Sequence, residues 1–151
     1  MIKIIDGNLF DSNTEVIAHQ CNCQGVMGSG VAAEVKKRYP NVYQAYRFAY
    51  EKYGLTLGQV IVVKTPDNKR IANLLAQEKY GYDGKQYTHY DKLQECFDRI
   101  VEFMKEENLK TIAFPYLMAC HRGGGDWNVV YKMIEDTFKD FDVEIWRLDK
   151  G

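Results

Sequence analysis

The sequence predicts an α/β protein with helices on both faces of a mostly parallel or mixed sheet. Short β-rich runs alternate with longer stretches in which apolar residues recur at helical spacing. Two of the apolar runs lead into glycine-rich loops, and each loop is followed by the start of a helical pattern. The sequence has no internal repeat and no low-complexity stretch. This alternation is typical of a sheet covered by helices on both faces.

The first strands and helices are predicted in the N-terminal third of the chain. Residues 2–6 are β-rich and end in a turn signal, and residues 15–19 form a more apolar run that is typical of a central strand. Helices are predicted over residues 30–38 and 41–53, separated by Pro40, which cannot continue a helix. The aromatic side chains of the second helix are expected to pack against the sheet.

The remaining sequence continues the alternation. Residues 59–63 and 70–75 are predicted to form a hairpin, because the Pro-Asp-Asn sequence at residues 66–68 is typical of a turn. A pattern resembling a capping box, from Thr88 to Asp91, predicts the start of the next helix. The other predicted elements are a loop over residues 77–86, a helix to Met104, a strand over residues 111–114, a helix capped by Asp126 that runs to Phe138, and a strand over residues 143–148.

Size and charge narrow the class of protein. The 151 residues suit one domain, residues 1–151, with a sizeable core. The net charge of −1 gives no general attraction to nucleic acid or to an anionic membrane. No apolar run approaches the roughly 18 residues that span a bilayer, and no secretory signal is visible. The 4 cysteines are therefore expected to be reduced thiols, and we expect a cytoplasmic protein that binds no membrane.

The two glycine-rich loops indicate a phosphate-bearing ligand. The first follows the predicted strand at residues 15–19, and the second follows the strand at residues 111–114. Free N–H groups and the dipole at a helix N-terminus attract anions, and glycine lets the backbone approach a ligand closely. Ligands of such sheets bind beyond the carboxyl ends of the strands. Two such loops at one sheet end therefore indicate a diphosphate.

Three segments, taken together and in this order, resemble the macrodomain family. They are Gly7-Asn8-Leu9, the run His19-Gln20-Cys21-Asn22-Cys23-Gln24-Gly25 with Gly28-Ser29-Gly30-Val31-Ala32, and Gly123-Gly124-Gly125-Asp126-Trp127. The resemblance covers essentially the whole chain. It is nearest to the branch that holds the ADP-ribose 1″-phosphate phosphatases and the terminal ADP-ribose protein glycohydrolases. It implies a three-layer α/β/α domain with a mixed, roughly six-stranded sheet that binds ADP-ribose without a metal ion or a cofactor.

The resemblance also implies which residues contact each part of the ligand. Asn8 stands where the family often has an aspartate beside the adenine, and Asn22 matches an asparagine that contacts the distal ribose. Residues 28–32 and 119–126 match loops that wrap the diphosphate and the distal ribose. The ligand-binding candidates are Gly7, Asn8, Leu9, Gln20, Cys21, Asn22, Met27, Gly28, Ser29, Gly30, Val31, Ala32, Ala119, Cys120, His121, Arg122, Gly123, Gly124 and Gly125.

The sequence departs from the family pattern at three places. Gln77 stands at the position of a lysine that forms a covalent adduct in the glycohydrolases, with Glu78 and Lys79 next to it. Gly123 stands at the position of the acid that assists that lysine. The sequence at residues 119–122 is Ala-Cys-His-Arg, where the family commonly has Gly-Cys-Gly. These departures argue against the lysine-adduct mechanism and put a titratable group and a cation beside the predicted phosphate site.

The catalytic candidates are His19, Asn22, His121 and Asp126. A histidine can move protons near neutral pH, but His19 can equally be a structural histidine at a strand end. His121 and Arg122 can hold a terminal phosphate or be solvated loop residues. Asp126 is first a helix N-cap, and positioning a water is its further interpretation. The amides of residues 28–30 can stabilise developing negative charge.

Two other chemistries remain open at this point. If the strand at residues 15–19 continues, His19, Cys21 and Cys23 share one of its faces, and Cys120 with His121 can join them as zinc ligands, although the spacing fits no common zinc motif. Cys23 or Cys120 near a helix N-terminus can act as a nucleophile. Small buried residues beside a ligand are the simpler interpretation, and no metal is expected.

The sequence therefore predicts a hydrolase that acts at the distal ribose of an ADP-ribose derivative, with ADP-ribose 1″-phosphate as the substrate. The phosphate of the substrate can itself activate the water. Alternatives are removal of ADP-ribosyl esters from acidic side chains, and a non-catalytic reader or sponge for ADP-ribose. An ADP-ribosylated macromolecule, including a nucleic acid with a terminal ADP-ribose, is a further partner. We expect a monomer.

Overall fold

The computed structural model contains six strands and four α-helices in the part of the chain described here, which is residues 1–27, 30–77, 88–118, 120 and 125–148. The strands are β1 (Ile2–Asp6), β2 (Val16–Asn22), β3 (Val60–Lys64), β4 (Arg70–Gln77), β5 (Thr111–Pro115) and β6 (Asp142–Arg147). The helices are α1 (Gly30–Arg38), α2 (Pro40–Tyr53), α3 (Tyr90–Glu106) and α4 (Trp127–Thr137), with a short 3₁₀ helix at Leu9–Asp11.

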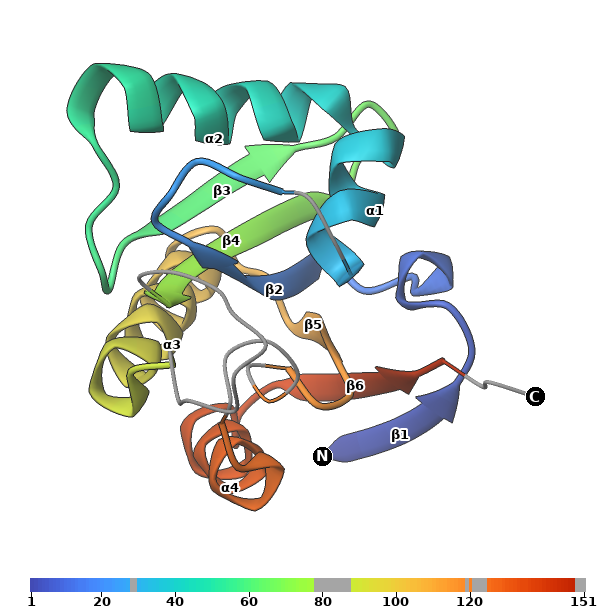
Figure 1. Cartoon of the computed structure of the whole chain (residues 1–151). Helices are drawn as coiled ribbons and strands as arrows, with labels where there is room; N and C mark the ends of the chain where they lie inside the picture. Colours follow the sequence, from blue (N-terminus) through green and yellow to red (C-terminus); the bar gives the residue numbers. More distant parts are fainter. Residues whose placement is uncertain (28–29, 78–87, 119, 121–124, 149–151) are drawn as a thin grey trace.

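All six strands belong to one mixed sheet with the order β1-β6-β5-β2-β4-β3 (Figure 1). Five of them run parallel to their neighbours, and β3 pairs with β4 in the antiparallel direction. The β3–β4 pair is the predicted hairpin, in which Val62 lies opposite Ala72. The predicted α/β class and the mixed sheet are confirmed.

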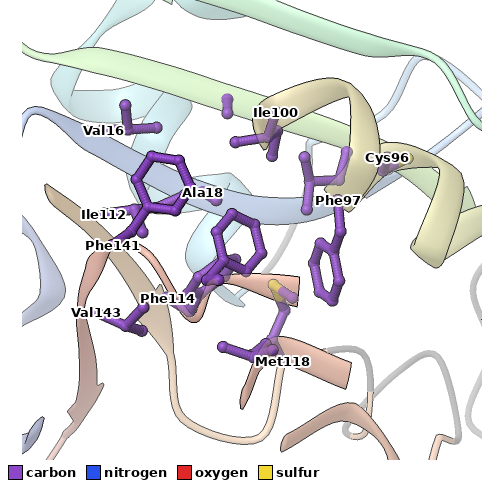
Figure 2. Packing of buried hydrophobic residues seen from close by; sticks show 14 of the residues in the cluster. Val16, Ala18, Cys96, Phe97, Ile100, Ile112, Phe114, Met118, Phe141 and Val143 are labelled. Carbon is purple, nitrogen blue, oxygen red and sulfur yellow. The ribbon is translucent and has the colours of Figure 1, made fainter. Parts of the chain in front are cut away.

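The two faces of the sheet carry separate hydrophobic cores. Val16 and Ala18 of β2 belong to the core under α3 and α4, whereas Ile17 and Cys21 of the same strand belong to the core under α1 and α2. Figure 2 shows the first core around Phe97 of α3. Successive strand residues point to opposite faces, so an apolar run such as that of β2 marks a strand buried on both sides.

The predicted boundaries are most in error where strands continue past their apolar residues. β2 extends beyond His19, because Gln20 and Cys21 still pair with β4. α3 begins at Tyr90, not at Thr88, and the N-cap residue His89 makes no side-chain cap bond. Thr88 instead forms an antiparallel bridge with Gln77 at the end of β4, and its Oγ1 accepts a hydrogen bond from Gln20, so it belongs to the sheet edge and not to the helix cap.

The end of the chain agrees more closely with the sequence. Asp126 is the N-cap of α4, and its side chain accepts a hydrogen bond from the Asn128 N–H, as predicted. The predicted loop over residues 77–86 lies outside the described residues, apart from Gln77, which ends β4. In the described part of the chain, no helix combines the length and apolar character needed to cross a membrane.

Candidate functional site

The candidate site lies at the edge of the sheet where the five parallel strands end. β1 leads into Gly7, Asn8 and Leu9, β2 leads into the first glycine-rich loop before α1, and β5 precedes the second before α4. Because parallel strands point the same way, these three segments start from the same edge of the sheet. This is the part of an open α/β sheet where ligands bind.

The first glycine-rich loop is held by the side chain of Asn22. Its Nδ2 donates to the Val26 carbonyl oxygen at 2.9 Å, and its Oδ1 accepts from the Gln24 N–H at 2.9 Å. The buried Tyr46 hydroxyl of α2 lies 2.7 Å from the Asn22 carbonyl oxygen and 3.0 Å from Oδ1. An amide has two N–H donors, so one N–H of Asn22 is left for a ligand.

The same loop is pressed against α2 at Gly25. Gly25 is buried and has φ +76°, a conformation that side chains rarely adopt. A Cβ added there would lie 2.6 Å from Cδ2 of the Tyr50 ring. Arg47 donates to the Gly25 carbonyl oxygen at 3.1 Å and stacks over Tyr50 at 5.0 Å. Only glycine therefore fits between β2 and α2 at this point.

Several ligand-binding candidates beside this loop contribute their side chains to packing. Met27 is buried in the core under α1 and α2, and Val31 and Ala32 pack against that core. Gly30 opens α1 with φ +61°. Gly28 and Ser29 lie outside the described residues. Contact between a ligand and Met27 would therefore go through backbone groups.

His19 lies inside the protein. It is 1% exposed, and its Nε2 is 2.7 Å from Oδ1 of Asn73, whose own Nδ2 donates to the Ile61 carbonyl oxygen at 2.8 Å. Burial lowers the pKa of His19 to about 4, and the bond to Asn73 opposes this shift. The imidazole is therefore neutral at pH 7 and is buried in the protein interior. This placement favours the structural interpretation and argues against proton transfer by His19.

Gln20 points to the other face of β2. Its Nε2 donates to Gln77 Oε1 at 2.8 Å and to Thr88 Oγ1 at 3.0 Å. Its Oε1 is buried and has no partner in the described part of the molecule. Cys21, the next residue, is buried with its Sγ 3.6 Å from His19 Nε2, and burial raises the pKa of its thiol.

The second loop is described only at Cys120, Gly125 and Asp126; Ala119, His121, Arg122, Gly123 and Gly124 lie outside the described residues. The Asp126 N–H donates to the Tyr90 hydroxyl of α3 at 2.8 Å, which ties the end of the loop to that helix. Burial raises the pKa of the Cys120 thiol to about 11, so the thiol is protonated at neutral pH. This pKa argues against Cys120 as a nucleophile.

The end of β1 forms the far side of the candidate site. Gly7 has φ +151°, and a Cβ added there would lie 3.0 Å from the Trp146 ring. Asn8 caps the 3₁₀ helix, with its Oδ1 accepting from the Phe10 N–H at 2.9 Å. Leu9 is buried in the core under α1 and α2. The side chain of Asn8 keeps its Nδ2 donors for a ligand.

Sequence reasoning missed three residues that hold the site in place: Asn73, Tyr46 and Trp146. Each contacts a candidate residue that is distant in the chain, such as Asn22 for Tyr46. A tyrosine on the buried face of a helix needs a partner for its hydroxyl, and that need was the available signal. Among the described residues no group of three or more His, Cys, Asp or Glu is arranged to hold a metal ion.

A family model places the chain among known proteins. The Macro domain model matches residues 18–134, which include both glycine-rich loops and most of the sheet. The chain belongs to the Macro domain family.

Two curated relatives show how the chain compares with characterised members. A DNA ADP-ribosyl glycohydrolase from Mycobacterium tuberculosis is 29% identical over 153 residues, which cover 97% of this chain and 42% of that protein. An ADP-ribose 1″-phosphate phosphatase from Scheffersomyces stipitis is 28% identical over 172 residues, covering 95% of this chain and 96% of that protein. The chain spans about two fifths of the length of the DNA ADP-ribosyl glycohydrolases it matches.

Solved structures agree with the fold. The macrodomain of Mycobacterium tuberculosis DarG superposes with a TM-score of 0.85 at 28% identity and covers 97% of both chains. Thermosipho africanus DarTG in complex with ADP-ribose has a TM-score of 0.81 at 24% identity, covering 97% of this chain and 41% of that one. The second likeness concerns the fold alone.

Proposed function

We propose that this protein binds ADP-ribose across the carboxyl edge of its sheet and hydrolyses a derivative substituted at the distal ribose. The observation that carries the proposal is the spread of candidate segments along this edge. Asn8 follows β1 and Asn22 ends β2, and the sheet order separates these strands by three inter-strand steps. At about 4.8 Å per step the separation is about 14 Å, which suits a ligand with a base at one end and a sugar at the other.

ADP-ribose 1″-phosphate is the substrate we favour. The Scheffersomyces stipitis relative with that activity in its name matches nearly end to end, at 95% of this chain and 96% of that protein. Hydrolysis adds water across the bond between the phosphorus atom and the 1″ oxygen, and it releases ADP-ribose and inorganic phosphate. A substrate phosphate oxygen would accept the proton of the attacking water.

The bonding of Asn22, Asp126 and His19 suggests their roles, and the family resemblance suggests the roles of the two glycine-rich loops. The remaining N–H of Asn22 would contact the distal ribose, and the backbone amides of residues 28–30 would hold the diphosphate. His121 and Arg122 would bind the terminal phosphate, since Arg offers a bidentate fork. Asp126 would cap α4 and hold the second loop. His19 would position β2 from inside the core.

Removal of ADP-ribose from DNA is the second candidate activity. It is favoured by the relatives named DNA ADP-ribosyl glycohydrolase, which are 29% identical over 97% of this chain. Gln77 at the position of the family's catalytic lysine argues against the lysine-adduct route in this chain. A reader without turnover is the third candidate. We further propose that the chain acts as one domain and as a monomer in a reducing cytoplasm, in keeping with its free cysteines.

Calorimetric titration with ADP-ribose, followed by two release assays, tests the proposal. The wild type should bind ADP-ribose and release phosphate from ADP-ribose 1″-phosphate faster than it releases ADP-ribose from an ADP-ribosylated oligonucleotide. Asn22→Ala should weaken both binding and release, whereas the matched control Asn13→Ala, at an exposed position before β2, should change neither. Tight binding without release of either product would establish the reader instead, and no binding of ADP-ribose would refute the proposal.

A further inference from the structure

Gln20, near the carboxyl end of β2, carries a buried hydrogen-bond acceptor that the described part of the protein does not use. Its Nε2 donates to Gln77 Oε1 at 2.8 Å and to Thr88 Oγ1 at 3.0 Å. Its Oε1 is buried and unpaired. It is the one buried side-chain nitrogen or oxygen without a partner among the residues described in this structure. Buried polar atoms are nearly always paired, so this exception needs a physical reason.

The amide of Gln20 is rigidly placed. Two hydrogen bonds from Nε2 reach neighbours on different segments, the end of β4 and the residue two before α3. The backbone of Gln20 is also fixed, since it pairs with Leu74 in the parallel β2–β4 ladder. The position of Oε1 is therefore set before any ligand arrives, at the cost of one unpaired acceptor. Preorganised groups of this kind bind a ligand without a further ordering cost.

The position of Gln20 in the sheet indicates which part of a ligand can contact it. Gln20 lies near the carboxyl end of β2, on the face opposite to the Asn22 side chain, and Asn8 follows β1, three inter-strand steps away in the sheet order. A ligand with its adenine at Asn8 would bring its other end to β2. At that end the phosphate oxygens are acceptors and cannot pair with Oε1, whereas sugar hydroxyls are donors. The unpaired acceptor therefore fits the distal ribose and not the diphosphate.

We propose that Gln20 Oε1 accepts a hydrogen bond from a hydroxyl group of the distal ribose, so that Gln20 selects ligands that carry this sugar over ligands that end at the diphosphate. The proposal rests on the proposed function, because both place ADP-ribose along the same sheet edge. It goes beyond that function by assigning the selection of ADP-ribose over ADP to the side chain of Gln20.

Titration calorimetry with two probes, ADP-ribose and ADP, tests the proposal. Gln20→Met removes the acceptor and keeps the length of the side chain. It should weaken binding of ADP-ribose about tenfold and change binding of ADP by less than about twofold. The control Gln44→Met, at an exposed position of α2, should change neither affinity.

A structural disturbance would give a different pattern from a lost contact. If Gln20→Met weakens ADP and ADP-ribose equally, or weakens neither, Gln20 does not contact the distal ribose and the proposal is wrong. If the wild type itself fails to bind ADP-ribose, the proposed function fails first, and that result is visible before any variant is compared.

Discussion

Acid should destabilise this protein through His19. Burial lowers the pKa of His19 from 6.5 to about 4 in the folded chain, against a smaller opposing effect of Asn73. In the unfolded chain the imidazole has its ordinary pKa of 6.5, so between the two values the unfolded chain binds a proton that the folded chain does not. His19 therefore leaves stability unchanged above the higher pKa, and it lowers stability progressively as the pH falls toward the lower one.

The size of the effect follows from the difference between the two pKa values. Each pKa unit corresponds to about 1.4 kcal/mol, so the full loss below about pH 4 is about 3 kcal/mol. Between about pH 7.5 and about pH 5 the loss from this one group is about 2 kcal/mol. For a chain of this length, that loss lowers the melting temperature by about 4–8 °C.

Urea unfolding at about pH 7.5 and about pH 5 measures the effect in the wild type and two variants. Carboxylates also titrate in this range, so the informative quantity is the difference in acid-induced loss between the wild type and His19→Gln. That variant should lose about 2 kcal/mol less than the wild type, because glutamine takes up no proton. His89→Gln, at an exposed position, should behave as the wild type. Equal losses in the wild type and His19→Gln would refute the argument.

Three further variants test the bonds that hold the site. Tyr46→Phe removes the hydroxyl that Asn22 binds, so it should lower the free energy of unfolding by about 1–2 kcal/mol and weaken ADP-ribose binding, as measured by urea unfolding and calorimetry. Gly25→Ala should cost about 1–3 kcal/mol in thermal unfolding, because of its positive φ and the nearby Tyr50 ring; wild-type stability would show that the loop can move. Asp126→Ala should cost about 1 kcal/mol of stability and Asp126→Asn much less, and equal costs would contradict the capping role.

The elements were predictable from the sequence because their signals are local. The apolar run that begins at Val16 predicts a strand buried on both faces, and the Asp126 cap predicts the start of α4. The end of β2 was not predictable from apolarity, because Gln20 and Cys21 are held in the sheet by pairing with β4. Strand pairing with a distant segment leaves little trace in a short window of sequence.

The location of the candidate site was predictable from the sequence, but the roles of its residues were less so. The glycine-rich loops and Asn22 mark the sheet edge from sequence alone. The bonding of Asn22 depends on Tyr46, which is 24 residues further along the chain, and the burial of His19 depends on Asn73, 54 residues further along. Such contacts form only in the folded chain. A histidine at a strand end therefore looks like a catalytic residue in the sequence and like a core residue in the structure.

The two tryptophans of this chain lie beside different segments of the candidate site and provide two optical probes. The Trp146 ring lies against Gly7 at the end of β1, and Trp127 opens α4 directly after the second glycine-rich loop. Indole emission responds to local polarity, so replacing either tryptophan by phenylalanine leaves a fluorescence signal from the other one alone. A ligand that arrives base first would change the Trp146 emission before the Trp127 emission. Stopped-flow fluorescence can thus show which half of a nucleotide binds first, and it needs no added label.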